Sequence, residues 1–244
     1  MEERCLYAEL TPRRFRERLK EAAVAYLPLG TLEWHGEHLP LGADGLQSQG
    51  FFRRLAREVG GIVLPMLFVG PDREMKRPEG DYYGMDIYGF SEEEPRQLPG
   101  SAYWIEEKLF HRLLAGILKS LARAGFRIVV AHGHGPSTHH FLEHREAWER
   151  EFGLKLLACW GSPQDAELGI QTDHAAANET SLMMALHPEL VEMENLDPDP
   201  AVWPVAVGGR DPRTEASGET GEKAMDLQVE RMAGLIRAAL KESA

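Results

Sequence analysis

The segment "PLGTLEWHGEHLPLGADG", residues 28–45, gathers three side chains that could hold a metal ion. Glu33 and His35 are two residues apart, so on an extended backbone their side chains point the same way. Asp44 adds a second carboxylate a short distance further along the chain. Carboxylate oxygens and imidazole nitrogens are common ligands of divalent transition metals. The segment therefore predicts a metal site, although Asp44 taken alone is equally typical of a helix N-cap.

A second cluster, "HGHG" at residues 132–135, follows an apolar run. We take His134 as the candidate ligand, with His132 as the competing choice because residues two apart share one face of a strand. The glycines on either side of His134 allow the backbone to approach an ion or ligand closely.

A third cluster contains His174 and Glu179. Five positions turn an ideal helix by about 500°, so both side chains can face one site only if His174 precedes the regular helix. Asp173 could cap that helix or orient an imidazole. Without the other clusters, Glu179 would be interpreted as an ordinary carboxylate on a helix surface. We expect the other histidines on helices to be surface residues; these are His111, His139, His140 and His187.

Hydrophobic periodicity and end signals predict helices that alternate with short apolar strands. Thr11 with Pro12 marks one helix start, and Ser101 and Gly125 mark the start and stop of another. The predicted helices cover residues 11–22, 46–60, 101–125, 138–152 and 222–244, with a further helix ending before Pro188. The predicted strands cover residues 23–30, 62–70, 126–135 and 154–160.

This alternation predicts an α/β fold with a parallel sheet flanked by helices. Ligands of such sheets bind outside the carboxyl ends of the strands, and the first two polar clusters follow strands. One ion needs three or four ligands, and a shared carboxylate can bridge two ions about 3.5–4 Å apart. Residues 71–100 show no period and could form a pocket wall, an inter-subunit contact or a surface loop.

The bulk composition limits the class of protein. A length of 244 residues, 43% of them hydrophobic, suits a single α/β domain over residues 1–244. A net charge of −12 argues against a nucleic-acid partner. We expect a cytoplasmic protein without a membrane partner, for three reasons. The two cysteines are isolated, the N-terminus has no apolar run, and no span reaches about 20 apolar residues.

Three blocks of the sequence resemble the creatininase (creatinine amidohydrolase) family over about residues 20–225. They are "PLGTLEWHGEHLPLGAD", "GFRIVVAHGHGPS" and "DHAAANETS". "LPGSAYW" also resembles the entry to the family's long helix. The resemblance implies a three-layer α/β fold, two divalent ions (zinc, with manganese or iron as further candidates) and a homo-oligomer, often a hexamer.

The resemblance also implies roles for individual residues. The metal ligands that it implies are Glu33, His35, Asp44 and His134, with Asp44 bridging the two ions. His174 matches the histidine that lies beside the scissile bond, and Glu179 matches either the last ligand or an acid/base partner.

Two departures from the family pattern bear on the second ion and on the substrate. Where creatininases have an aromatic residue and a Glu ligand, this chain has Gly135 and Pro136, so the second ion must take Glu179 or another ligand. One further carboxylate is lost in "AAA", residues 175–177. Substrates other than creatinine therefore stay open: cyclic amides, formamides attached to a pyrimidine, and peptide ends.

The sequence thus predicts a metal-dependent amidohydrolase that cleaves a non-peptide or cyclic amide or formamide C–N bond with metal-activated water. His174 is expected to protonate the leaving nitrogen, and Glu179 to complete the metal shell or take the proton of water. One alternative is an inactive metal- or ligand-binding member of the same fold. The other is a flavodoxin-like nucleotide-binding module, although the carboxylates after the first strand would repel phosphate.

Overall fold

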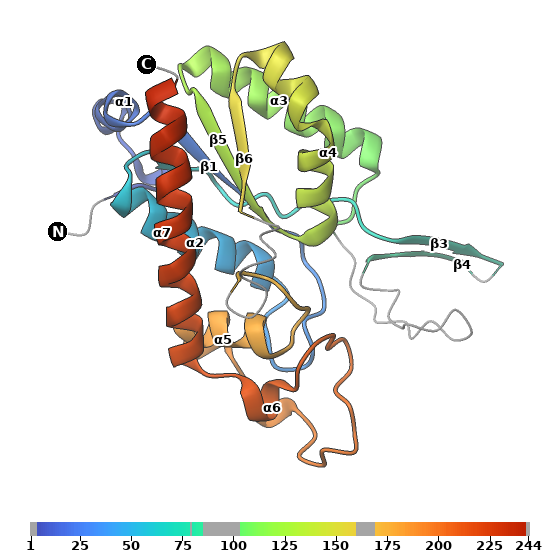
Figure 1. Ribbon diagram of the computed structural model, residues 1–244. Coiled ribbons are helices and arrows are strands. Elements are labelled where there is room, and N and C mark those ends of the chain that lie inside the picture. Colours follow the sequence, from blue (N-terminus) through green and yellow to red (C-terminus); the bar gives the residue numbers. More distant parts are fainter. Residues whose placement is uncertain (1–3, 79, 85–102, 160–168, 243–244) are drawn as a thin grey trace.

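The computed structural model describes residues 4–78, 80–84, 103–159 and 169–242. Its centre is a four-stranded sheet in the order β2-β1-β5-β6, in which all neighbouring strands are parallel (Figure 1). The four strands are β1 (Val24–Leu29), β2 (Ile62–Val63), β5 (Ile128–Gly133) and β6 (Lys155–Ala158). Leu29 pairs with Gly133, so β1 and β5 end side by side at the carboxyl edge.

The described helices cover both faces of the sheet. They are α1 (Pro12–Glu21), α2 (Ala43–Glu58), α3 (Glu107–Ala124), α4 (Gly135–Phe152), α5 (Ala177–Leu186), α6 (Pro212–Glu215) and α7 (Gly218–Glu242). Short 3₁₀ turns lie at η1 (Tyr7–Glu9), η4 (Pro188–Leu190) and η5 (Met193–Asn195).

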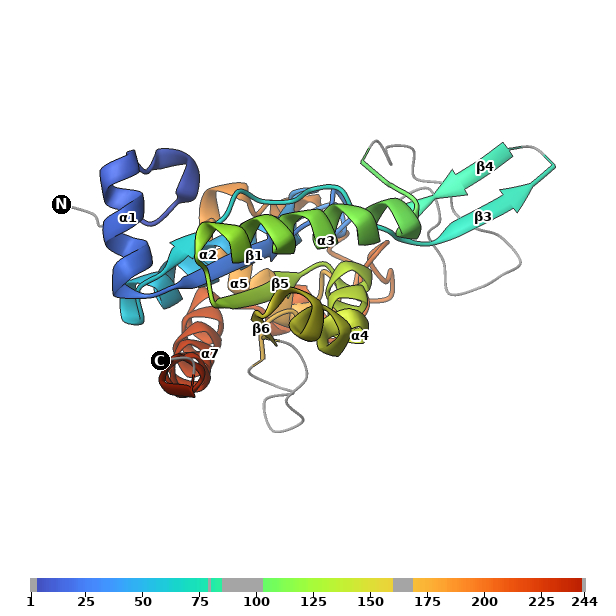
Figure 2. The same cartoon turned by 90° about the horizontal axis from the view of Figure 1, so that it is seen from above.

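Alternation of side chains along β1 creates two separate cores. Val24 and Tyr26 pack with residues of α2 and α7 on one face. Leu27 and Leu29 pack with α3 and α4 on the other. Both faces are buried, which explains why the strand is a continuous apolar run. The result is the expected three-layer α/β arrangement, and the predicted fold class is confirmed (Figures 1 and 2).

Several predicted element boundaries were right. Thr11 caps α1, since its side chain accepts a hydrogen bond from the backbone N–H of Arg14. Gly125 ends α3 in the left-handed conformation that favours glycine. Ser101 lies outside the described residues, but the predicted start of this helix was wrong: residues 103–106 are not helical, and α3 begins at Glu107.

Two predictions about the middle of the chain were wrong. Regular pairing of the second strand stops at Val63, although Leu67 still donates a backbone hydrogen bond to the carbonyl of Pro28 as the chain runs on beside β1. The region expected to be irregular contains an antiparallel hairpin, β3 (Glu74–Arg77) with β4 (Gly80–Tyr83). Figures 1 and 2 both show this hairpin projecting away from the sheet.

The turn after β5 requires glycine at residue 133 because the backbone there lies close to β1. Gly133 has φ +141°, and a Cβ there would clash with the carbonyl oxygen of Leu29. This close approach lets the backbone N–H of His134 donate to the same oxygen at 2.7 Å. Gly133 therefore brings the backbone against β1 and fixes His134 at the sheet edge.

Cys5 and Cys159 are both buried, and no disulfide joins them. None of the described helices combines the length and the apolar character needed to cross a membrane.

Candidate metal centre

Three side chains from separate segments meet beyond the end of β1. His35 Nε2 lies 3.6 Å from Asp44 Oδ1 and 3.4 Å from Glu179 Oε2. His35, Asp44 and Glu179 are 1%, 4% and 2% exposed. We call them the first triad. Their ligand atoms all lie within 4.8 Å of one another, which is a separation that a single ion can span.

A second triad lies beside the first. His134 Nε2 is 3.6 Å from Glu33 Oε2 and 3.9 Å from Asp72 Oδ2. The ligand atoms of Glu33, Asp72 and His134 also lie within 4.8 Å of one another. Glu33 joins the two groups, because it also lies within this distance of His35 and His174.

The carboxyl edge of the sheet explains the convergence. Glu33 and His35 follow β1, and a hydrogen bond from the backbone N–H of Glu33 to the carbonyl of Leu41 closes their loop. Asp44 lies in the first turn of α2, which begins earlier than predicted. The alternative role of Asp44 as an N-cap is wrong: Gly42 occupies that position, and the Asp44 carboxylate accepts a hydrogen bond from Gln171 Nε2 instead.

His174 precedes α5, as required if it and Glu179 are to face one site. It pairs with Gly208 in an isolated antiparallel bridge, and its ring centroid lies 4.6 Å from that of His35. Asp173 stabilises the start of α5, since its carboxylate accepts backbone N–H bonds from Asn178 and Glu179 at 2.7 and 3.0 Å.

Hydrogen bonds to backbone carbonyls fix the tautomers of His35 and His174. His35 Nδ1 contacts the carbonyl oxygen of Glu33 at 3.2 Å, and His174 Nε2 contacts that of Trp34 at 2.9 Å. A carbonyl only accepts hydrogen bonds, so both of these nitrogens carry the proton. In the neutral rings, the lone pairs therefore lie on His35 Nε2 and His174 Nδ1.

Several buried ligand atoms have no hydrogen-bond partner among the described residues. They are His35 Nε2, Asp44 Oδ2 and His134 Nε2. Buried polar atoms are nearly always satisfied, so a cluster of unsatisfied ones requires an explanation. Each of these atoms is a good ligand for a divalent ion, and the residues present therefore fit such an ion.

The pKa shifts of the clustered carboxyl and imidazole groups also support a site for a divalent ion. Burial raises the pKa of Glu33 and Glu179 above the usual carboxyl range. Burial also opposes ionisation of Asp44, but nearby imidazoles outweigh it and hold the pKa of Asp44 below its usual value. Burial opposes protonation of His35, yet Glu179 and Asp44 raise its pKa well above normal. Bound protons thus balance the buried charges, and a divalent ion would displace them.

His132 does not join the cluster. Its Nδ1 bonds to Ser48 Oγ at 2.8 Å, and its ring lies edge-on to Phe51 and Phe52. Burial lowers the pKa of His132 to about 4, which suits a neutral packed imidazole. Between the two histidines considered, the structure brings only His134 to the triads.

Two residues of each triad, Asp44 and Glu179 of the first and Glu33 and His134 of the second, line one cavity of about 190 Å³. His174, Pro136 and Gln171 line it as well. A larger cavity of about 650 Å³ lies beside α3, where Leu64, Met66 and Ile117 are among its mainly apolar lining. The larger cavity is lined by no carboxylate or imidazole among the described residues, whereas the smaller one is lined by carboxylates and imidazoles of the triads.

Sequence reasoning missed two residues of this site. Asp72 follows the predicted strand at 62–70, and the rule that ligands bind beyond strand ends could have identified it. No sequence pattern indicated the contact between Gln171 and Asp44. Gln171 and Ala175 both adopt a left-handed backbone conformation, with φ +53° and φ +52°. Left-handed non-glycine residues often occur at functional sites, and this pair brackets His174.

Two of the histidines expected on the surface are not simple surface residues. His140 is only 4% exposed, and it contacts His111 on α3. His139, its neighbour in sequence, is exposed as expected.

The fold and the site define an α/β protein whose sheet edge carries two carboxylate–imidazole triads suited to divalent ions. The chain belongs to the creatininase family: the family model described as creatinine amidohydrolase matches residues 8–84 and 86–236. It is similar to creatinine amidohydrolase from Pseudomonas putida, at 27% identity over 94% of this chain and 95% of that protein.

Solved structures agree with this assignment. A mutant creatininase described as Zn-Zn type superposes with a TM-score of 0.73 at 25% identity, covering 98% of this chain and 99% of that one. A structure described as creatininase Mn gives the same TM-score and coverage at 24% identity and shows the shared fold. The relatives are thus metal-containing members of a family of non-peptide amide hydrolases.

Proposed function

We propose that this protein is a dinuclear metal-dependent amidohydrolase that cleaves a C–N bond of a small cyclic amide or formamide. The observation that carries the proposal is the pair of adjacent triads, each with an unpartnered imidazole Nε2 and each contributing two residues to one cavity. Family membership supports amide hydrolysis and speaks against the nucleotide-binding alternative.

The first ion would be held by His35, Asp44 and Glu179, and the second by Glu33, Asp72 and His134. Asp44 would be shared between the two ions, and its Oδ2 has no hydrogen-bond partner among the described residues. Asp72 would supply the carboxylate that Pro136 cannot: its Oδ1 accepts the backbone N–H of Arg73, and its Oδ2 faces His134.

Bound divalent ions would lower the pKa of water and polarise the amide carbonyl. The chain itself supplies the proton transfer. His174 Nδ1 is unprotonated because Nε2 donates to Trp34, so Nδ1 would accept a proton from the attacking water. The same atom would then donate that proton to the leaving nitrogen, which could not easily depart as an amide anion.

Zinc is the resident ion we propose first, because a relative at 25% identity is described as Zn-Zn type; manganese and iron are the alternatives. The cavity is smaller than the roughly 300–1,000 Å³ typical of drug-sized ligands, which favours a compact substrate over a peptide end.

A homo-oligomer, with a hexamer as the first expectation, stays part of the proposal. The projecting β3–β4 hairpin supports it, because a lone two-stranded hairpin is marginally stable in water and docking on another subunit would stabilise it. Light scattering after gel filtration measures the subunit number.

The function is tested with protein purified without chelator, loaded with Zn²⁺ and incubated with creatinine, other cyclic amides and an N-formylated aminopyrimidine. We expect release of a carboxylate and an amine from at least one compound. Release that also occurs with chelator-treated protein would refute the metal-dependent mechanism. Two bound ions with no turnover of any compound would favour the inactive binding alternative.

A further inference from the structure

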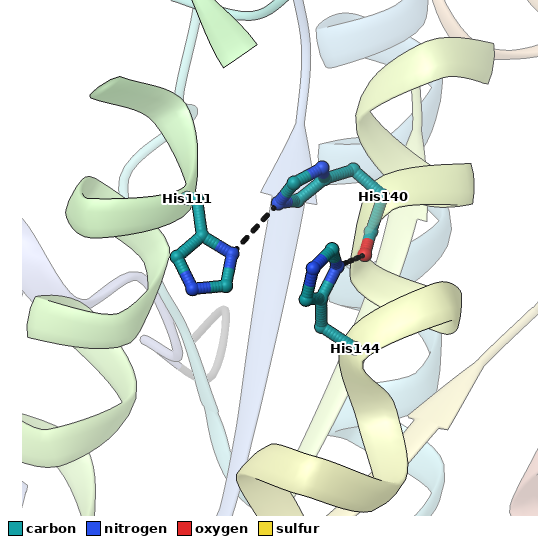
Figure 3. A group of neighbouring side chains, drawn as sticks. All are labelled: His111, His140 and His144. Carbon is teal, nitrogen blue, oxygen red and sulfur yellow. Dashed lines mark hydrogen bonds between the residues drawn. The ribbon is translucent and has the colours of Figure 1, made fainter. Parts of the chain in front are cut away.

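A second group of imidazoles lies between α3 and α4, built from residues outside both triads (Figure 3). Glu107 and His111 are four apart on α3, and His140 and His144 are four apart on α4. Residues at this spacing share one face of a helix, so each helix presents two polar side chains to the other.

The distance between two of the imidazole nitrogens is close to that between two ligands of one metal ion. His111 Nδ1 and His140 Nε2 are joined by a hydrogen bond of 3.2 Å (Figure 3). Two nitrogens bound at about 2.0–2.1 Å to a tetrahedral zinc ion would lie roughly 3.3 Å apart. A ligand nitrogen of His144 lies within 4.8 Å of both, and its ring stacks on that of His140 at 4.3 Å.

A bound ion would replace the hydrogen bond between His111 and His140, and two other hydrogen bonds orient the rings of His140 and His144. His140 Nδ1 contacts Glu107 Oε1 at 3.0 Å, the carboxylate–imidazole arrangement that orients metal-binding histidines. His144 Nδ1 donates to the carbonyl oxygen of His140 at 3.0 Å (Figure 3), so its lone pair lies on Nε2.

The site is both supported and accessible. Buried Trp148 packs beside all three imidazoles, with ring centroids 5.1 to 6.0 Å away, and so restricts their movement. The opposite side opens on a cavity of about 450 Å³, and the Glu107 side chain is 67% exposed. An ion can therefore reach the imidazoles from solvent.

We propose that His111, His140 and His144 form an additional cation site for a late first-row transition ion such as Zn²⁺, Ni²⁺ or Cu²⁺, positioned by Glu107. Imidazole nitrogen suits these ions, whereas Ca²⁺ and Mg²⁺ require oxygen ligands. Lys108 and Arg112 line the same cavity, and their positive charge further disfavours cations held only by charge. A bound ion would link α3 to α4 across one face of the sheet.

The test compares zinc stoichiometry in three proteins by equilibrium dialysis against buffered Zn²⁺, with elemental analysis. His144→Gln removes one ligand, and His139→Gln makes the same change at the exposed histidine on the same helix. We expect the wild type and His139→Gln to bind one more ion per chain than His144→Gln. Because this is a difference between variants, it does not depend on how many ions the triads hold.

Two further measurements separate binding from packing. Glu107→Gln should weaken the additional site by about 10–100-fold while keeping the imidazoles in place. Cu²⁺ bound beside Trp148 should quench indole fluorescence in the wild type, and this component should be absent in Trp148→Phe. Equal zinc stoichiometry in the wild type and a folded His144→Gln would overturn the proposal and leave the imidazoles as a packing cluster.

Discussion

Two buried serines offer a matched pair of substitutions that tests which imidazole binds an ion. Ser137 Oγ bonds to His134 Nδ1 at 3.0 Å, and Ser48 Oγ bonds to His132 Nδ1 at 2.8 Å. Both serines are fully buried. Ser137→Ala and Ser48→Ala therefore remove the same kind of hydrogen bond, but only the first one orients a proposed ligand.

The two variants should lose similar stability. Each change leaves a buried imidazole nitrogen without its partner, which costs about 1–3 kcal/mol. For a chain of this size the melting temperature should fall by about 2–12 °C in either variant. Metal affinity should separate them: loss of a partner that orients a ligand weakens binding by about 10–100-fold, or about 1.4–2.8 kcal/mol. We expect that loss in Ser137→Ala alone.

Competition against a chromophoric zinc chelator gives the affinities, and calorimetry gives the melting temperatures. The Ser48 hydroxyl also donates to the backbone carbonyl of Asp44, a bond that does not involve the Asp44 carboxylate. If Ser48→Ala weakened zinc binding while Ser137→Ala did not, His132 would replace His134 in the site. If neither changed it, the second triad would not be a metal site.

Further predictions concern the proton carrier, the ions and the turn after β5. His174→Gln should retain both ions by elemental analysis and reduce turnover by about 10²–10⁴-fold; unchanged turnover would exclude His174 from the mechanism. Chelator treatment should lower the melting temperature, and Zn²⁺ at 100 times its Kd should restore about 2.7 kcal/mol per site; a melting temperature insensitive to chelator would argue against bound ions. Gly133→Ala should cost more than the roughly 1–2 kcal/mol expected for Gly153→Ala, since both have positive φ but only Gly133 faces a backbone clash. Chemical denaturation measures this difference, and equal costs would contradict it.

The parts of the fold that depend on hydrophobic patterning were predictable. The apolar runs of β1 and β5 identified strands buried on both faces, and alternation with helices indicated the parallel sheet. The short β2 was overextended, because residues 64–70 are apolar and run beside β1 without regular pairing. The β3–β4 hairpin carries charged and tyrosine side chains with no apolar alternation that would have revealed it.

The residues of the candidate site were likewise predictable where they follow a recognisable strand. Glu33, His35 and His134 could be found because they directly follow recognisable strands. Asp44 lies in the same short segment as Glu33 and His35, but its role as ligand or helix cap depended on where α2 begins. His174 and Glu179 took their roles from the motif resemblance, since their position in the site depends on how α5 packs. Asp72 and Gln171 were missed because irregular segments bring them to the edge. The contact between His111 and His140 depends on the approach of α3 to α4, and helical spacing alone does not encode it.

The central claim is that two cations bind side by side at the carboxyl edge of the sheet. Anomalous diffraction from crystals of protein purified without chelator, recorded at the absorption edges of the metals found by elemental analysis, tests it most directly. We predict one peak among His35, Asp44 and Glu179, and another among Glu33, Asp72 and His134. Fully occupied ions found only elsewhere, or no ion at either triad in protein supplied with Zn²⁺, would contradict the account.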